Sequence, residues 1–510
     1  MEFLVYIFYL ILVPLILLLP LYVLIMFKRS KDGDQLPPSP PKLPIIGNLH
    51  QLREPPHQEL RKLSQKYGPV MLLQLGSVPT LVISSAEAAK QVLKTHDLDF
   101  CTRPPLACFK RISHNYLDIA CSPFGEYWRE IRKICVLELL SMKRVQSFKV
   151  IREEEVAEMI HSISSTANST APIDVFECLS SFTNRTICRV AFGSKLNQGI
   201  DQFDEGILRE TMDEITNLIS AFWFSDIFPK VGWIVDRISG IHGRFEKCCK
   251  NLDTYIQDVI EKHLNPERLR SEYDDLIDVL LKLQKDGTST IRHTNEHIKA
   301  ILMDVFVAGV DTVAVTMNWT MAELIKNPAT MHKVQEEIRS HVGKNKGKQV
   351  QENDLLHFQY LKLVVKETLR LHPPLPLSFP RECMRKNKID GYDVKPKTRV
   401  LINVWAIGRS PMYWDKPDKF YPDRFIDKPV EFGGQKDFSF LPFGGGRRGC
   451  PGIDMGMVTV ELALANLLHN FDWKLPSGMK TEDLNMDEVS GIVTHKKDPL
   501  HLVPIQSKNF

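Results

Sequence analysis

The sequence predicts a mainly α-helical fold with small β-sheets, preceded by a transmembrane helix. Most of the chain after residue 84 carries apolar residues at the spacing of amphipathic helices. Strand-like runs are short, and the clearest two, Val70–Leu75 and Thr80–Ile83, predict a hairpin around Gly76. The N-terminal residues are continuously apolar over the length of a membrane span.

The N-terminal apolar segment has no charge over the 25 residues Phe3–Phe27. A helix of this length crosses a hydrocarbon core of roughly 30 Å. A cleaved secretory signal is the alternative, but such a signal begins with basic residues, whereas this segment begins with Glu2. The basic cluster Lys28–Lys31 follows the span instead, and it predicts that the rest of the chain is cytoplasmic. We therefore expect residues 1–27 to be a transmembrane signal-anchor.

Residues 28–44 are predicted to form a basic, proline-rich hinge. The run Pro37–Pro44 contains too much proline for a helix and predicts a stiff, extended spacer. Residues 45–510 show no internal repeat, no low-complexity tract and no second linker, so we expect them to form one domain.

Helical periodicity within this domain is clearest in five segments, each long enough for several turns. These segments are Tyr127–Leu140, His297–Lys326, Ala329–His341, Gln359–Leu371 and Ile453–Leu468. Strand-like pieces are expected at Arg399–Val404 and near the C-terminus.

Charge and cysteine usage exclude several functional classes. Lys and Arg total 65 against 62 Asp and Glu, so the chain has no global field for a polyanion, and we expect no nucleic-acid partner. The 10 cysteines include no CxxC pair, which argues against a zinc ribbon or a disulfide framework and favours a reducing compartment.

One cysteine, Cys450, has unusual surroundings. It ends a glycine-rich run, Phe438–Gly449, and an apolar helical segment follows. Glycines let the backbone turn closely around a bulky group, and N–H groups near a helix start favour a thiolate. The spacing Gly444-x-Gly446-x-x-Gly449 also matches a dinucleotide-binding pattern, but that pattern should follow a strand, and here Pro442 interrupts the preceding segment.

The pattern Phe443-x-x-Gly446-x-Arg448-x-Cys450-x-Gly452 resembles the haem-binding loop of the cytochrome P450 family. This resemblance implies that residues 45–510 are a haem-thiolate monooxygenase domain with the cytochrome P450 fold. Cys450 would be the axial ligand of the haem iron. Phe443 and Gly452 would belong to the cofactor-binding loop, and Arg448 would pair with a haem propionate.

Further motifs resemble those of the family and appear in the family's order. Glu367 and Arg370 lie one helical turn apart, and with Arg424 they would form a buried structural triad rather than a catalytic group. By itself, such a Glu–Arg pair is usually an exposed salt bridge.

The segment Ala308–Thr312 resembles the family's oxygen-activating motif. Its glycine, Gly309, costs about 1 kcal/mol in a helix, and the resemblance implies that the helix opens there to admit oxygen. Thr312 would supply a hydroxyl for oxygen activation, and Asp311 would relay protons from solvent. Val313 stands where the family usually has Ser or Thr, so the second hydroxyl of the relay is missing.

Three more residues are implied as haem-propionate partners by the same resemblance. Trp128 and Arg132 are spaced to reach one propionate from the same helix face, and Arg381 is a further partner. The segments Leu43–Asn48, Leu371–Pro374 and Phe440–Gly444 are similar to those of plant microsomal members of clan seventy-one.

The implied reaction inserts one atom of dioxygen into a substrate bond, with electrons from NADPH. No nicotinamide or flavin motif is visible, so a separate reductase at the endoplasmic reticulum membrane is the expected partner, with cytochrome b5 as a further electron donor. A non-oxygenating haem-thiolate dehydratase or isomerase and a plain electron-transfer haem protein are the alternatives. A basic docking patch, for which ordinary solvated charge is the competing interpretation, would comprise Arg129, Lys133, Lys143, Arg144 and Arg447.

The predicted substrate pocket is apolar, which favours a neutral, lipophilic plant metabolite, first a terpenoid and second an alkaloid or an amino-acid-derived oxime or phenol. No acidic anchor for an amine is evident, because Asp311 has another task and the sequence does not determine which face Asp304 occupies. The predicted pocket residues are Phe222, Trp223, Val310, Leu375, Leu377, Phe379, Ile492 and Val493.

Overall fold

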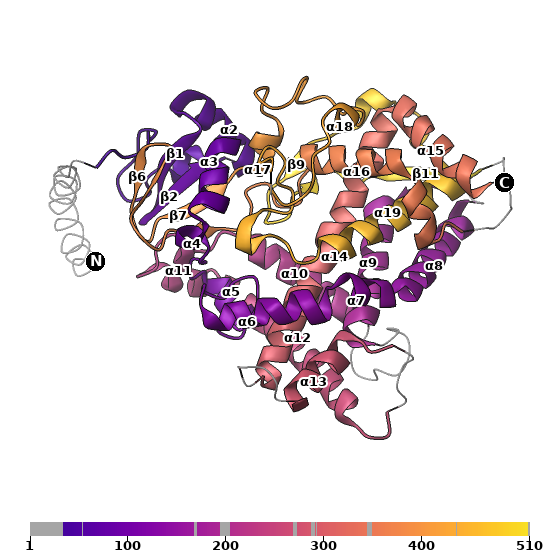
Figure 1. Ribbon diagram of the computed structural model, residues 1–510, viewed down its shortest axis with the longest axis horizontal. Coiled ribbons are helices and arrows are strands. Elements are labelled where there is room, and N and C mark those ends of the chain that lie inside the picture. Colours follow the sequence, from indigo (N-terminus) through magenta and orange to yellow (C-terminus); the bar gives the residue numbers. More distant parts are fainter. Residues whose placement is uncertain are drawn as a thin grey trace, which may run out of the picture.

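A computed structural model describes residues 34–53, 55–167, 171–193, 205–268, 273–286, 291, 293–343, 349–434 and 436–507 of the protein. A long helix, α14 (Asn295–Lys326), runs through the middle of a mainly helical body with small sheets (Figure 1). The predicted signal-anchor, residues 1–27, lies outside the described residues.

Helix α14 is buried because it is apolar nearly all round. Its C-terminal half packs against α9 (Val175–Phe192), α16 (Gln359–Leu371) and α19 (Ile453–Asn470). Among the described helices, α14 alone is long and apolar enough to cross a membrane, but its burial makes it a core helix.

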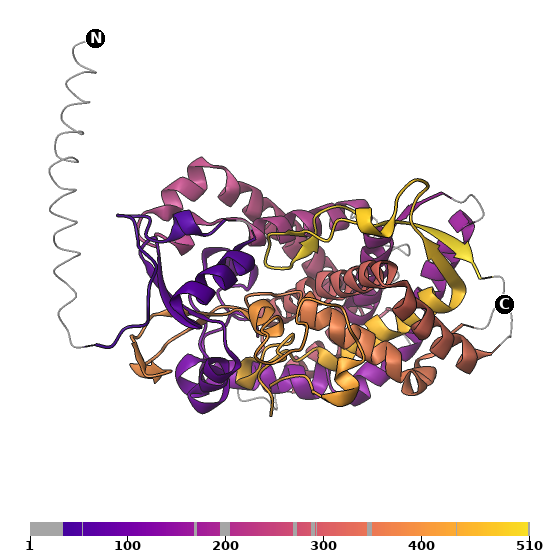
Figure 2. The ribbon, with the colours of Figure 1, turned by 90° about the horizontal axis from the view of Figure 1, so that it is seen from above.

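The main sheet lies at one end of the molecule (Figures 1 and 2). It has the order β1 (Val70–Leu75), β2 (Val78–Ile83), β7 (Arg399–Ile402) and β4 (Arg381–Glu382). Strands β1 and β2 form the predicted hairpin, in which Leu75 lies opposite Val78, while β2 and β7 run parallel.

The other strands form three smaller sheets. They are β3 (Ile173–Asp174), β11 (His501–Gln506) and β8 (Phe471–Lys474) in one; β5 (Asn387–Ile389) and β6 (Tyr392–Val394) in another; and β9 (Glu488–Val489) and β10 (His495–Lys496) in the last.

The remaining α-helices surround α14 and the sheets (Figure 1). They are α2 (Pro56–Tyr67), α3 (Ala86–Lys90), α4 (Asp97–Phe100), α5 (Ala107–Ile112), α6 (Glu126–Ile134), α7 (Met142–Ser147), α8 (Lys149–Ala167), α10 (Glu205–Ser220), α11 (Gly232–Ile238), α12 (Ile241–Leu264), α13 (Leu276–Asp286), α15 (Pro328–Val342), α17 (Val404–Gly408) and α18 (Arg424–Asp427).

The predicted helices are confirmed with one local difference, and one predicted strand ends earlier than expected. The segment expected at Tyr127–Leu140 is α6 followed by a π-helical turn, Cys135–Leu139. The strand expected to reach Val404 ends at Ile402, because the side chain of Asn403 accepts a hydrogen bond from the backbone N–H of Ala406 and starts α17.

The proline-rich hinge contacts the domain instead of standing clear of it. The backbone N–H of Leu72 in β1 donates to the carbonyl of Pro38 at 2.9 Å. The Nδ2 of Asn48 donates to the carbonyls of Pro40 and Pro41, each at 3.2 Å. The described end of the hinge is therefore held on β1.

Two large apolar clusters meet at α14. The N-terminal part of the helix, which includes Ile301 and Phe306, packs into a cluster with α9, α10 and α12. The C-terminal part, which includes Trp319 and Leu324, packs into a second cluster with α16 and α19. The middle of α14 lies between the clusters and borders the cavity described next.

Candidate active site

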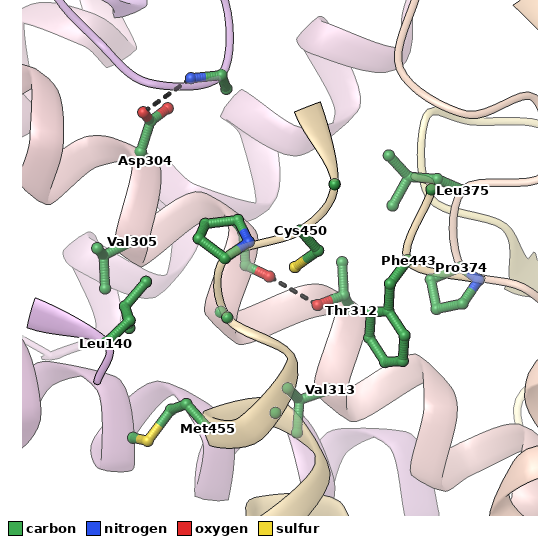
Figure 3. Close-up of a pocket in the computed structure, with 18 of the residues that line it drawn as sticks. Leu140, Asp304, Val305, Thr312, Val313, Pro374, Leu375, Phe443, Cys450 and Met455 are labelled. Carbon is green, nitrogen blue, oxygen red and sulfur yellow. Dashed lines mark hydrogen bonds between the residues drawn. The ribbon is translucent and has the colours of Figure 1, made fainter. Parts of the chain in front are cut away.

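A mostly apolar cavity of about 320 Å³ lies beside the middle of α14. Figure 3 shows the Cys450 side chain directed into the space that Thr312, Leu375 and Phe443 also border. The walls come from α14, α9, α19, the segment before β4 and the loop that ends at Cys450.

The Cys450 loop folds back on itself before α19. The backbone N–H of Cys450 donates to the carbonyl of Phe443 at 3.0 Å. Gly446 has a φ of +65°, and a Cβ there would lie 2.3 Å from the carbonyl oxygen of Leu93. A side chain at this position is therefore excluded by both conformation and space.

Burial raises the pKa of the Cys450 thiol, although the backbone N–H of Gly452 and the charge of Arg132 lower it. The backbone N–H thus favours the thiolate, as expected from the sequence, but the surroundings as a whole do not. The cost of burying a charge outweighs the two favourable contributions. A metal cation bound to sulfur would reverse this balance.

The arginines predicted to bind propionates, Arg132, Arg381 and Arg448, all line the cavity. Burial lowers the pKa of Arg448 to about 10 and lowers those of Arg132 and Arg381. Asp97 pairs with Arg381 at 3.1 Å, whereas the recorded partners of Arg132 and Arg448 are backbone carbonyls. This part of the wall is therefore strongly electropositive.

Trp128 is close to this group but does not line the cavity. Its Nε1 donates to the carbonyl of Ile119 at 3.0 Å, and its ring packs under the guanidinium of Arg448 at 4.1 Å. The indole N–H is thus bonded to the backbone in this structure, and a shared contact of Trp128 and Arg132 with one ligand group stays a prediction.

Arg103 is a cavity residue that the sequence analysis did not identify. Its guanidinium donates to the carbonyls of Ala120, Phe379 and Pro380 at 2.8–2.9 Å and lies 4.7 Å from the Phe379 ring. Burial lowers its pKa well below the usual value. No motif in the sequence around Arg103 indicates this position, which depends on contacts with residues more than 270 positions away.

These features fit a haem. The Cys450 thiol borders a mostly apolar cavity that four guanidinium groups also line, three of them buried and that of Arg132 half-buried, as donors for anionic groups.

The two predicted catalytic residues point in different directions. Thr312 lines the cavity, and its hydroxyl donates to the carbonyl of Ala308 at 2.7 Å (Figure 3). Asp311 lies outside the lining, and its Oδ2 accepts a hydrogen bond from Nε2 of His495 at 3.0 Å.

Gly309 has a packing role. Helix α14 continues through Gly309 without a break, and an opening of the helix beside it stays a prediction. A Cβ at this position would lie 2.7 Å from Cδ1 of Ile187 on α9. The glycine allows the two helices to approach closely.

The predicted triad is assembled in the core. Arg370 donates to both carboxylate oxygens of Glu367 at 2.8 and 2.9 Å, and Arg424 donates to Oε1 at 3.0 Å. The Glu367 and Arg370 side chains are fully buried. Both arginines also donate to the carbonyl of Lys419.

Of the predicted pocket residues, Leu375 and Phe379 line the cavity and six do not. The segment before β4 borders the cavity as predicted, whereas the segments around Trp223 and Ile492 contribute none of its described lining residues. Phe222 is 52% exposed, Trp223 packs on Phe245, Leu377 joins the cluster around Leu60, and Val310, Ile492 and Val493 pack in the two large clusters.

Asp304 lines the cavity from α14. Its Oδ2 accepts hydrogen bonds from the backbone N–H groups of Ile119 at 2.6 Å and Ala120 at 3.2 Å; Figure 3 shows the carboxyl group directed toward this loop. Burial, and then the nearby Asp118 carboxyl, raise the pKa of Asp304 well above its usual value. The protonated form is therefore favoured.

The sequence and the fold of this chain are both similar to those of known proteins. The family model described as "Cytochrome P450" matches residues 37–503. "Cytochrome P450 71B10" of Arabidopsis thaliana is 47% identical over 498 residues, covering 97% of this chain and 98% of that protein. "Strychnine-11-hydroxylase" of Strychnos nux-vomica is 46% identical over 504 residues and covers 97% of each chain.

Solved structures show the same fold. A zebra fish cytochrome P450 with abiraterone superposes with a TM-score of 0.74 at 25% identity, over 89% of this chain and 100% of that one. The family model spans most of this chain, and the plant relatives span nearly all of it. The chain therefore belongs to the cytochrome P450 family and is a haem-thiolate monooxygenase of the plant type, which takes electrons from NADPH through a separate reductase.

Proposed function

We propose that this monooxygenase oxidises a neutral, lipophilic plant specialised metabolite, first a terpenoid. The observation that carries the proposal is the apolar cavity between Cys450 and the α14–Leu375–Phe379 walls, which offers burial and, among its described lining residues, a single carboxyl group, that of Asp304. Burial contributes about 25 cal/mol per Å² of apolar surface, so a hydrocarbon skeleton gains most from such a site.

Cys450 would hold the haem iron, and Arg103, Arg132, Arg381 and Arg448 would hold its propionates. The bound haem supplies the oxygen-activating chemistry. The Thr312 hydroxyl, at the cavity surface, can donate a hydrogen bond to a group bound beside it once it leaves the Ala308 carbonyl. Leu375 and Phe379 would orient the substrate by contact and keep water out of the cavity.

The state of Asp304 favours a neutral substrate. An amine needs a carboxylate as its counter-charge, and Asp304 is the acidic residue among the described cavity-lining side chains. Its Oδ2 is held by two backbone N–H groups, and its raised pKa favours the uncharged form. Pairing with a cationic ligand would require the ionised form of Asp304, which burial disfavours, and exposure of its carboxylate.

An alkaloid is the second candidate, and one observation favours it. The relative named "Strychnine-11-hydroxylase" shares 46% of its residues with this chain over nearly the full length of both proteins. An alkaloid bound as the neutral base would also fit an apolar cavity.

Residues 1–27 would anchor the protein in the endoplasmic reticulum membrane by a single span, with the hinge and the domain of residues 45–510 on the cytoplasmic side. A reductase would dock near α6, and cytochrome b5 would use the same surface. Arg129, Lys133 and Lys143 are exposed there, beside the apolar Leu137 and Met142. Arg447 is exposed on the Cys450 loop, which α6 reaches through the Arg132–Gly449 hydrogen bond of 2.7 Å.

Two measurements test the assignment. The carbon-monoxide difference spectrum of the reduced protein should show the red-shifted Soret band of thiolate-bound haem, and Cys450→Ala should lose that band. A retained band in this variant would contradict the ligand assignment.

The substrate proposal needs matched panels. Membranes with the full chain, a plant reductase and NADPH should oxidise members of a neutral terpenoid panel and leave amines of similar size and permanent positive charge unchanged. Oxidation of the charged amines alone would overturn the proposal, whereas oxidation of tertiary amines only above their pKa would favour the alkaloid candidate.

A further inference from the structure

The contact between Asp311 and His495 joins the middle of α14 to the C-terminal part of the chain. Nε2 of His495 lies 3.0 Å from Oδ2 of Asp311. The two residues are 184 positions apart in sequence, so this pairing is produced by the fold alone.

Successive residues on a helix point about 100° apart. Accordingly, Thr312 faces the cavity while Asp311 faces β10. Asp311, which the family resemblance implies to be the proton donor, thus contacts His495, whereas the hydroxyl group of Thr312 lies at the cavity surface.

His495 is held firmly in its position. The backbone carbonyl of Thr494 accepts a hydrogen bond from Nε1 of Trp319 at 3.1 Å, and the Thr494 N–H donates to the carbonyl of Pro374 at 2.9 Å. The imidazole packs edge-on against the Phe176 ring at 5.2 Å. A histidine fixed on both sides in this way can keep Asp311 in one orientation.

The His495 side chain is more exposed to solvent than the Asp311 side chain that it contacts. The His495 side chain is 27% exposed and the Asp311 side chain is 15% exposed. The imidazole therefore lies on the solvent side of the carboxylate, and both lie outside the cavity that contains Cys450.

We propose that His495 is the positioning residue that supplies protons to Asp311. Solvent gives a proton to Nδ1 of His495 while the proton on Nε2 passes to Oδ2 of Asp311. The imidazole is then neutral, with its proton on Nδ1. Proton exchange with water returns the ring to the tautomer that carries the proton on Nε2. The protonated Asp311 then turns toward Thr312, delivers the proton to the cavity side and returns as a carboxylate. This inference rests on the proposed roles of Asp311 and Thr312.

The test uses membranes that contain the full chain, a plant reductase and NADPH, without added substrate. Reduction of dioxygen to hydrogen peroxide consumes one NADPH per O2, and reduction to two waters consumes two. Water formation requires further protons at the active site, so the NADPH-to-O2 ratio and the peroxide yield report proton supply.

His495→Gln keeps a side-chain N–H that can reach Asp311 but cannot pass a proton through a ring. We expect both His495→Gln and His495→Ala to lower the rate of water formation roughly tenfold, within the range of a lost general acid–base step. Peroxide should rise correspondingly, with an unchanged carbon-monoxide spectrum. The control is His332→Gln, which alters a histidine–glutamate pair that is 79% and 73% exposed.

A wild-type ratio in His495→Gln would overturn the proposal, because His495 would then only hold the carboxylate. If His495→Ala does not fold, His495→Asn replaces it. Asp311→Asn separates the two claims: a wild-type ratio in Asp311→Asn contradicts the role of Asp311 itself, whereas a changed ratio there with wild-type ratios in the His495 variants contradicts only the role of His495.

Discussion

The guanidinium of Arg370 donates two hydrogen bonds to the carboxylate of Glu367, at 2.8 and 2.9 Å, and both side chains are fully buried. Such a pair is costly to break, because removing one charge leaves the other buried without a partner. The pair also fixes Arg424 and the backbone at Lys419. Loss of this pair should therefore destabilise the segment from Lys419 to Arg424, which precedes the Cys450 loop.

Glu367→Gln should lower the free energy of unfolding by about 3–5 kcal/mol, the cost of an unpaired buried charge. Chemical unfolding followed by far-UV circular dichroism measures the change. Lys333→Met breaks an ion pair with Asp423 in which the lysine is 51% exposed, and it should cost less than about 1 kcal/mol. Equal effects of the two substitutions would contradict the structural role of the triad.

Arg448→Ala should weaken haem retention by about 10- to 100-fold, which is the loss of one or two charge-assisted hydrogen bonds. Transfer of haem from the purified protein to an acceptor apoprotein gives the rate of haem loss. Arg129→Ala removes an exposed arginine on the neighbouring helix α6 and provides the control. Haem loss that is unchanged in Arg448→Ala would show that the guanidinium serves only the loop carbonyls.

Glu488 should make stability depend on pH. Burial alone would raise the pKa of Glu488, but hydrogen bonds from His372 and His57 and the charge of Arg409 lower it far below its usual range. A carboxyl group with a lowered folded-state pKa stabilises the protein above its unfolded pKa of about 4.3, and this contribution is lost as pH falls.

The advantage of the wild type over Glu488→Gln should therefore shrink as the pH falls below about 4.3, the pKa of a glutamate in the unfolded chain. Urea unfolding at several pH values measures this difference. An advantage that grew on acidification would contradict the sign of the shift.

Gly309→Ala should destabilise the protein by about 1–3 kcal/mol, because the new methyl group would meet Ile187 at 2.7 Å. Ile187→Val in the same chain should restore part of the loss. Gly243→Ala is the matched control in an open helical site, with no atom within 4 Å of the new Cβ, and it should stabilise by up to about 1 kcal/mol. Destabilisation by both substitutions alike would rule out the packing explanation.

The sequence predicts best what local patterns determine. The Cys450 loop, the Glu367–Arg370 spacing and the Val70–Ile83 hairpin each depend on neighbours a few residues away, and β1 and β2 form the predicted hairpin. Leu375 and Leu377 show the limit. They are two residues apart, yet one lines the cavity and the other packs beside Leu60, because the loop has no regular period from which a direction could be predicted.

Contacts between distant segments were beyond prediction. Arg103 reaches Phe379 and Pro380 across more than 270 positions, and His495 reaches Asp311 across 184. Nothing near either residue in the sequence indicates these partners. The reason for Gly309 was also inaccessible, because it depends on Ile187 of another helix.

The hinge that lies on β1 has one more consequence. Strand β1 ends its sheet, so its outer N–H and carbonyl groups would otherwise be open to pairing with another chain. The Pro38 carbonyl accepts a hydrogen bond from the Leu72 N–H. Because proline has no backbone N–H, a strand of another chain cannot extend the sheet by pairing with it there. Shortened forms made for crystallisation should therefore keep the chain from residue 34 onward, since a cut after residue 44 would uncover the part of this edge at Leu72 and favour self-association.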